Sequence, residues 1–212
     1  MEYRYLTELI SRYTSLSTNK DCIEEACKVL INSFRKGGKL IVAGNGGSAA
    51  DADHIVGELM KGFVKKRPLD RKLQNNLLGV DSVLGGVLSS SLQSALPAIS
   101  LTGHPALSTA FGNDCDPVLI FAQQILGYGK EGDVFIAIST SGNSRNILYA
   151  AVAAKALGMK VIGLTGETGG KLESYSDICI KVPATECYKI QELHLPVYHT
   201  ICLTVEDAIF NK

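Results

Sequence analysis

His54 and Glu58 are the residues whose types and spacing point most directly to chemistry, and they follow a glycine turn in GNGGSAADADHIVGEL, residues 44–59. Because they stand four residues apart, their side chains share one face of a helix, about 6 Å apart along its axis. An imidazole and a carboxylate placed in this way can bind a metal ion or exchange protons with a substrate. The same pair is also common as a surface hydrogen bond, so the spacing alone leaves both interpretations open.

Two loops rich in glycine and hydroxyl groups are candidate phosphate sites. They are Gly44-Asn45-Gly46-Gly47-Ser48 and Ser139-Thr140-Ser141-Gly142-Asn143-Ser144. Glycine lets the backbone approach a ligand, and the N–H groups at the start of a helix favour an anion. Neither loop matches the glycine patterns of nucleotide sites, so we expect a sugar phosphate. The alternative is that the serines only cap helices.

The distance between the first loop and the candidate pair suits a phosphorylated sugar. His54 stands six residues after Ser48, which corresponds to about 9 Å along a helix. A phosphate bound at the start of this helix would leave the far end of the sugar near His54 and Glu58.

A second group of polar residues lies near the C-terminus, in QELHLPVYH, residues 191–199. Gln191 and His199 are eight residues apart, about 12 Å along an unbroken helix, which is close to the limit at which both could reach one point. They could instead serve different copies of a site. Pro196 predicts a kink or a helix start nearby. The alternative is that these polar groups are satisfied within the core or an interface.

The strand and helix patterns predict an α/β fold. Short, continuously apolar segments are separated by helical ones, which is typical of buried parallel strands in a doubly wound sheet. The expected strands lie within residues 39–44, 97–103, 133–144, 160–170 and 177–183, and the expected later helices within 147–157 and 189–210. In such a sheet ligands bind outside the carboxyl ends of the strands, where both glycine loops would lie.

We expect residues 1–212 to form a single domain with two attachments to the sheet. Residues 1–36 predict a pair of helices that is broken near residues 17–19. Residues 68–96 hold scattered leucines among glycine and serine, without a clear strand. They predict either a helical excursion over a site or a subunit contact.

Charge and composition exclude several classes of protein. The chain has 21 basic and 21 acidic residues and a formal net charge of zero, so we expect no nucleic-acid partner. The short basic run Lys61, Lys65, Lys66 and Arg67 predicts a solvated face, with at most a weak role in gathering an anionic substrate. The N-terminus lacks the apolar core of a signal peptide, and no run of about 18 apolar residues occurs. We expect a cytoplasmic protein without membrane contact.

The six cysteines indicate no special chemistry. They stand at positions 22, 27, 115, 179, 187 and 202, without CxxC spacing. We therefore expect free, buried thiols.

Several segments resemble bacterial phosphoheptose isomerases of the sugar isomerase (SIS) domain family. They occur in the family's order and cover nearly all of the chain: GNGGSAADADHIVGEL, AFGNDCDP, EGDVFIAISTSGNS, GMKVIGLTGETGGKL and KIQELHLPVYH. The resemblance implies a flavodoxin-like parallel sheet and a homotetramer whose active sites lie where subunits meet. It also implies conversion of D-sedoheptulose 7-phosphate to D-glycero-D-manno-heptose 7-phosphate.

The resemblance also implies the roles of individual residues. The implied substrate-binding residues are Asn45, Gly47, Ser48, Asp114, Ser139, Thr140, Ser141, Ser144 and Gln191. The implied metal position, occupied by zinc in members that bind it, comprises His54, Glu58, Gln191 and His199. Glu58 and His199 match the acid/base pair. Conversion of a ketose to an aldose through an enediol needs such a pair, together with positive charge near the carbonyl oxygen.

Three departures and three alternatives accompany this resemblance. The chain has Gly62 where the family usually has arginine and Tyr188 where it usually has an acidic residue, and residues 68–96 are longer than usual. An isomerase of another phosphorylated sugar is one alternative. A second is the non-catalytic relative that binds the bacterial replication initiator, but that protein lacks the counterparts of Glu58 and His199. A third is a sugar-phosphate sensor, which normally carries a DNA-binding helical module that we do not expect here.

Overall fold

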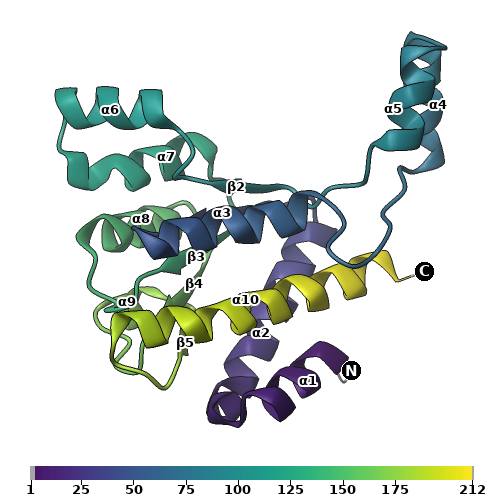
Figure 1. Cartoon of the computed structure of the whole chain (residues 1–212). Coiled ribbons are helices and arrows are strands. Elements are labelled where there is room, and N and C mark those ends of the chain that lie inside the picture. Colours follow the sequence, from purple (N-terminus) through teal and green to yellow (C-terminus); the bar gives the residue numbers. More distant parts are fainter. Residues whose placement is uncertain (1–2, 212) are drawn as a thin grey trace.

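The computed structural model describes residues 3–211 and contains a five-stranded sheet between layers of helices (Figure 1). The strands are β1 (Leu40–Ala43), β2 (Ala98–Ser100), β3 (Val134–Ile138), β4 (Lys160–Thr165) and β5 (Ile178–Lys181). Their order is β2-β1-β3-β4-β5, and every neighbouring pair is parallel. This is the flavodoxin-like order. The predicted α/β, doubly wound parallel sheet is confirmed.

The strands are mostly apolar because both faces of the sheet are covered. Leu40 and Val42 of β1 belong to one buried cluster, whereas Ile41 and Ala43 belong to another. Successive side chains of a strand point to opposite faces, so β1, β2, β3 and β4 each contribute to both clusters. The continuous apolar runs in the sequence follow from this arrangement.

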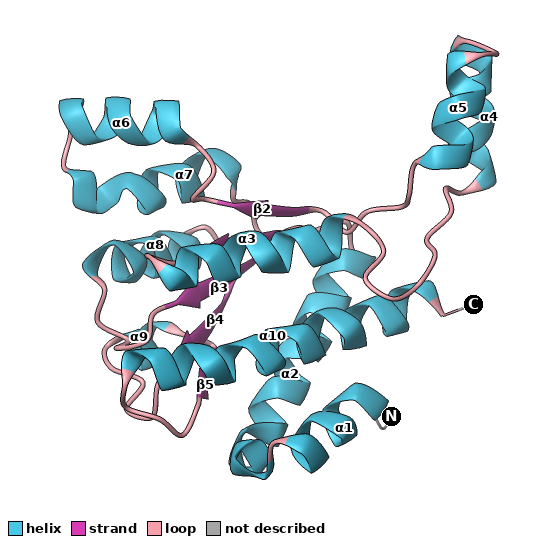
Figure 2. Ribbon diagram, in the orientation of Figure 1, coloured by secondary structure: helices cyan, strands magenta, loops and turns pink. Residues whose placement is uncertain are grey.

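The helices fall into two layers (Figure 2). The layer that shares the larger buried cluster contains α1 (Arg4–Arg12), α2 (Lys20–Arg35), α3 (Gly47–Met60) and α10 (Cys187–Phe210), with the short helix η1 (Thr14–Asn19) between α1 and α2. The other layer contains α7 (Ile120–Tyr128), α8 (Arg145–Ala156) and α9 (Leu172–Tyr175). Outside α7 lie α6 (Pro105–Asp114) and η2 (Pro117–Leu119).

The last helix runs without a break through Pro196. Proline removes one backbone donor from a helix, but α10 packs against α1, α2 and α3 along its length. We infer that this packing offsets the missing hydrogen bond. The helix begins at Cys187, two residues before the start of the helix expected over residues 189–210, so that expectation is confirmed and Pro196 does not mark a helix start.

Residues 68–96 contain two helices, α4 (Arg71–Val80) and α5 (Leu84–Ser91). We call residues 68–96 the arm. The two helices pack against each other and stand away from the body (Figure 1). At the base of the arm, Pro68 and Gln93 form an antiparallel bridge, and the N–H of Ser94 donates to the carbonyl of Arg67 at 2.7 Å. The segment is helical, as one of the two expected alternatives has it, and its role stays a prediction.

The cysteines are all free, but they are not all buried as expected. Cys27 and Cys202 lie in the core, and burial raises the pKa of the Cys27 thiol to about 12. Cys115 and Cys187 are exposed because they stand at the end of α6 and the start of α10, outside the two clusters. Among residues 3–211 no helix has the length and apolar character needed to cross a bilayer.

Candidate functional site

Two glycine loops lie side by side at the carboxyl edge of the sheet. One follows β1 and the other follows β3, and these two strands are neighbours. In this strand order the chain leaves β1 and β3 in opposite directions, which opens a crevice for a ligand. The first loop is also joined to the first turn of α8, which follows the second loop, because the side-chain amides of Asn45 and Asn146 donate to each other's oxygens at 3.0 and 2.8 Å.

Glycine is required at the closest points of these loops. A Cβ atom on Gly44 would lie 2.2 Å from the carbonyl oxygen of Ser48. Gly142 has a φ of +64°, and a Cβ there would lie 1.9 Å from the carbonyl oxygen of Gly169. The second loop is therefore packed against the turn that follows β4, and only glycine fits.

The helices that follow the loops begin without side-chain caps. Ser144 is the N-cap of α8, but its side chain accepts no hydrogen bond from the first turn. Its hydroxyl instead lies 3.0 Å from that of buried Ser139, which donates to it. Gly46, the N-cap of α3, has no side chain to offer. The alternative that these serines serve as caps is thus not supported, and both helix starts are suited to an anion.

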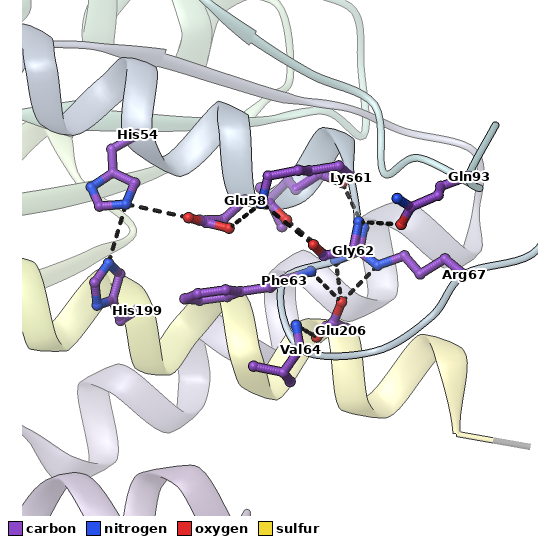
Figure 3. Close-up of polar contacts among 11 residues, drawn as sticks. His54, Glu58, Lys61, Gly62, Phe63, Val64, Arg67, Gln93, His199 and Glu206 are labelled. Atoms are coloured by element: carbon purple, nitrogen blue, oxygen red, sulfur yellow. Dashed lines mark hydrogen bonds and ion pairs between the residues drawn. The ribbon is translucent and has the colours of Figure 1, made fainter. Parts of the chain in front are cut away.

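His54, Glu58 and His199 form a polar cluster where α3 crosses α10 (Figure 3). The Nε2 atom of His54 lies 3.3 Å from Oε1 of Glu58 and 3.4 Å from Nε2 of His199. Glu58 also accepts a hydrogen bond from Lys61 at 2.9 Å through its other oxygen. The Phe63 ring stands 5.5 Å from the His199 ring. Residues 145 positions apart in the sequence thus meet within one chain.

The surroundings of His199 favour its neutral form. Burial lowers the pKa of the imidazole below 6.5, and the neighbouring His54 lowers it further, while Glu58 has the opposite, smaller effect. A neutral imidazole beside a carboxylate can take up or release a proton near neutral pH. The cluster is therefore suited to proton transfer.

The donor atoms of the cluster are chemically suited to zinc. Two imidazole nitrogens and a carboxylate are common zinc ligands, and ligand atoms around tetrahedral zinc lie about 3.3 Å apart for bonds of about 2.0 to 2.1 Å. The two separations measured from His54 Nε2 match this spacing. Within residues 3–211 of a single chain, however, no set of three or more His, Cys, Asp or Glu side chains is arranged to hold a metal ion.

Two other predicted residues lie apart from this cluster. The amide of Gln191 packs over Gly47 at the start of α3, where a Cβ on the glycine would lie 2.5 Å from its nitrogen. Gln191 is thus beside the first loop, about 10 Å along α3 from His54. Asp114 is exposed at the end of α6, where Asn113 donates to it at 2.9 Å. One chain does not bring either residue to the cluster.

The remaining predicted substrate residues belong to the two loops. Ser48 is buried, and its N–H donates to the Asn45 carbonyl at 3.0 Å. The Thr140 hydroxyl lies 3.5 Å from the Cys187 thiol at the start of α10. The Ser141 hydroxyl accepts from the N–H of Asn143 at 3.1 Å.

The prediction of a solvated basic face is wrong for Arg67. Its side chain is fully buried and donates to Glu206 at 2.7 Å and to the carbonyl of Leu59 at 2.7 Å. Glu206 also accepts from the N–H groups of Phe63 and Val64, at 2.8 and 3.0 Å. A buried cation needs a partner, and sequence reasoning missed this one. The available signal was Glu206 itself, an acid on the apolar side of the last helix.

The structure explains why Gly62 stands where the resembled family usually has arginine. A Cβ at this position would lie 2.3 Å from the carbonyl oxygen of Lys65 and 2.6 Å from Oε1 of Gln93. Oε1 of Gln93 also accepts a hydrogen bond from the N–H of Gly62 at 2.9 Å. Gln93 at the base of the arm thus occupies the space where a side chain at position 62 would begin. Tyr188, a second departure, is exposed on the first turn of α10.

Comparison with known proteins identifies the family. A model of the SIS domain matches residues 4–78 and 83–166. The phosphoheptose isomerase of Aneurinibacillus thermoaerophilus is 42% identical over 190 residues, which cover 90% of this chain and 83% of that protein. That of Rhodospirillum rubrum is 41% identical over 192 residues, covering 89% of this chain and 88% of the relative.

Solved structures agree with these sequence matches. A phosphoheptose isomerase from Francisella tularensis superposes with a TM-score of 0.73 at 32% identity, covering 95% of this chain and 98% of that one. One from Neisseria gonorrhoeae gives a TM-score of 0.71 at 28% identity, with the same coverage. The chain therefore belongs to the SIS domain family and, within it, to the phosphoheptose isomerases, which are aldose–ketose isomerases.

We predict that Glu206→Gln strongly destabilises the fold, because it leaves the buried Arg67 cation without its anionic partner. Removing one member of a buried ion pair costs about 3 kcal/mol or more of unfolding free energy. Urea unfolding measures this loss. The matched control is Glu186→Gln, which removes an exposed partner of Lys189 and should cost much less, because water screens an exposed ion pair. Equal losses in the two variants would show that the Arg67–Glu206 pair does not hold the helices together.

The stabilisation by Glu206 should depend on pH. Burial alone raises the pKa of Glu206, but the N–H groups of Val64 and Phe63 and the Arg67 guanidinium outweigh it, so the net pKa lies below 4.5. The stabilisation is therefore fully present above pH 4.5 and is lost as the pH falls toward the lower folded-state pKa. The gap in unfolding free energy between wild type and Glu206→Gln should narrow between about pH 5 and about pH 3. A constant gap over this range would contradict the assignment.

Proposed function

We propose that this protein is a phosphoheptose isomerase that interconverts D-sedoheptulose 7-phosphate and D-glycero-D-manno-heptose 7-phosphate through an enediol. The observation that carries the proposal is the course of α3, which begins in the first glycine loop and presents His54 and Glu58 farther along, where His199 of α10 meets them. The names of the relatives, at about 40% identity over most of the chain, support the same activity. We place the protein in the cytoplasm.

The length of α3 suits a phosphorylated sugar laid along it. From Gly47 to His54 is about 10 Å, and from Gly47 to Glu58 about 16 Å. In the proposed complex the phosphate lies against the serines of residues 139–144, with Asn45, Gly47, Ser48 and Gln191 beside the chain of the sugar and Asp114 nearby. The carbonyl end then lies at the polar cluster. An anion at the start of α3 and of α8 gains from their N–H groups and dipoles.

Glu58 and His199 are proposed as the acid/base pair. Glu58 removes a proton from C1 of the ketose, which forms the enediol, and a proton that has exchanged with solvent is then delivered to C2 to give the aldose. His199 exchanges a proton with the oxygen atoms of the two carbons. Its lowered pKa keeps it neutral and able to act in both directions near neutral pH.

A zinc ion is proposed at the same cluster, held by His54, Glu58 and His199. When bound, it would supply the positive charge that stabilises the carbonyl oxygen as charge develops there. Gln191 is the fourth proposed ligand. Because Gln191 of one chain lies beside Gly47 instead, a set that includes Gln191 requires a second copy of the chain.

A homotetramer with sites between subunits is proposed because the arm exposes apolar side chains that further copies of the chain would cover. Helices of ten and eight residues are marginal in isolation. Only Gly85 of the two helices is buried. Large apolar side chains on the arm are exposed instead: Leu73, Leu78, Val80, Val83, Leu84, Val87, Leu88 and Leu92. Apolar surface of this extent typically marks a protein contact.

We predict that Glu58→Gln loses turnover of sedoheptulose 7-phosphate by about 10³-fold, because the amide cannot accept the proton from carbon. Binding of the sugar phosphate should persist, since the loops are untouched. A coupled isomerisation assay and calorimetric titration measure the two quantities. As the matched control, Ser141→Ala should raise KM with little change in kcat. Normal turnover by Glu58→Gln would rule out the assigned base.

We predict that Val83→Glu together with Leu84→Glu dissociates the oligomer, because charges would replace two of the exposed apolar side chains at the tip of the arm. Light scattering after gel filtration should show a lower mass at unchanged far-UV circular dichroism. Lys72→Glu, which adds acidic charge to a solvated position of the same arm, should leave the mass unchanged. A double variant that keeps the wild-type mass would show that the arm is not the subunit contact.

A further inference from the structure

The hydroxyl of Tyr198 joins α3 to α10 directly behind His54. It lies 3.0 Å from Nδ1 of His54 and 3.2 Å from Oδ1 of Asp51. Asp51 and His54 are three residues apart on α3 and so share a face of that helix. Tyr198 itself is only 2% exposed. The three side chains thus form a chain of polar contacts from the interior to the cluster.

The number of protons fixes the direction of these hydrogen bonds. An ionised carboxylate can only accept, so the single hydroxyl proton of Tyr198 goes to Asp51. The oxygen of Tyr198 is then left as an acceptor toward His54. The contact at 3.0 Å is a hydrogen bond only if Nδ1 of His54 carries the proton.

A proton on Nδ1 leaves Nε2 of the neutral imidazole without one. This is the atom that faces Oε1 of Glu58 at 3.3 Å and Nε2 of His199 at 3.4 Å. A bare nitrogen turned toward a carboxylate oxygen is electrostatically unfavourable without a cation or an acidic proton between them. The hydrogen bond at Nδ1 of His54 therefore determines what its Nε2 atom can bind.

We propose that Tyr198, supported by Asp51, is a positioning residue that holds His54 in the Nδ1–H tautomer and so keeps Nε2 free to bind the metal ion of the isomerase site. This inference rests on the proposed function for its catalytic meaning, but the tautomer itself does not depend on activity. Hydrogen bonds from the far nitrogen of a metal-binding histidine set its ring orientation and basicity. Here the Tyr198 hydroxyl has the role that a carboxylate or carbonyl usually has, and the Asp51 carboxylate acts through this hydroxyl.

The direct test is the tautomer of His54 in metal-free protein. In protein labelled with nitrogen-15 and treated with a chelator, long-range proton–nitrogen correlation at about pH 8 separates the two tautomers of neutral histidine. The His54 signals are assigned by their loss in His54→Gln. Wild type should show Nδ1 protonated. Tyr198→Phe removes only the hydroxyl and should shift His54 toward the Nε2–H form. Tyr175→Phe, which removes a hydroxyl on α9 far from the cluster, should leave the signals unchanged.

Zinc binding gives a second readout. Tyr198→Phe should weaken zinc binding by about tenfold or more, with kcat falling while KM for the sugar phosphate stays near wild type. Tyr175→Phe should match wild type in both. A wild-type His54 in the Nε2–H form, or a tautomer and zinc affinity unaffected by Tyr198→Phe, would overturn the proposal. Because the tautomer is measured without substrate, an inactive enzyme with the expected tautomer would refute the proposed function and leave this inference standing.

Discussion

The buried ion pair between Arg67 and Glu206 is the interaction on which the geometry of the site depends. It fastens the segment after α3 to the last turns of α10, with Arg67 also bonded to the final carbonyls of α3 and Glu206 to the N–H groups of Phe63 and Val64. The cluster of His54, Glu58 and His199 draws on both helices, so it exists only while they keep this crossing. Breaking a buried pair leaves an uncompensated charge, which strongly destabilises the fold.

Helix α3 joins the two halves of the site. Its first turn belongs to the glycine loop that follows β1, and its later turns carry His54 and Glu58 to α10. A rigid helix therefore fixes the separation between an anion at one end and reacting carbons at the other. Rigid elements hold reacting groups in register more accurately than loops do. The same helix carries Asp51, which lies on the face of His54 and, through Tyr198, sets the orientation of its ring.

The sequence predicts those features that depend on local patterns. The apolar runs predict the parallel strands because both sheet faces are covered, the glycine loops follow from strand ends, and the spacing of His54 and Glu58 follows from the helical repeat. Features that depend on the crossing of α3 and α10 are not visible locally. Arg67 was expected in solvent because its partner Glu206 is 139 positions away. Tertiary packing also sets the contact of His54 with His199, the role of Tyr198 and the direction of the arm. Local sequence patterns therefore do not predict these features.

Exchange of substrate hydrogen with solvent tests the central claim that this crossing forms an isomerase site. The wild-type protein is incubated in deuterium oxide with sedoheptulose 7-phosphate, and the sugar is examined by proton NMR and mass spectrometry. An enediol formed at the polar cluster predicts deuterium at the carbon next to the carbonyl, together with formation of the aldose. A sugar that binds at the loops but stays free of deuterium, with or without added zinc, would contradict the account and indicate a protein that binds sugar phosphates without converting them.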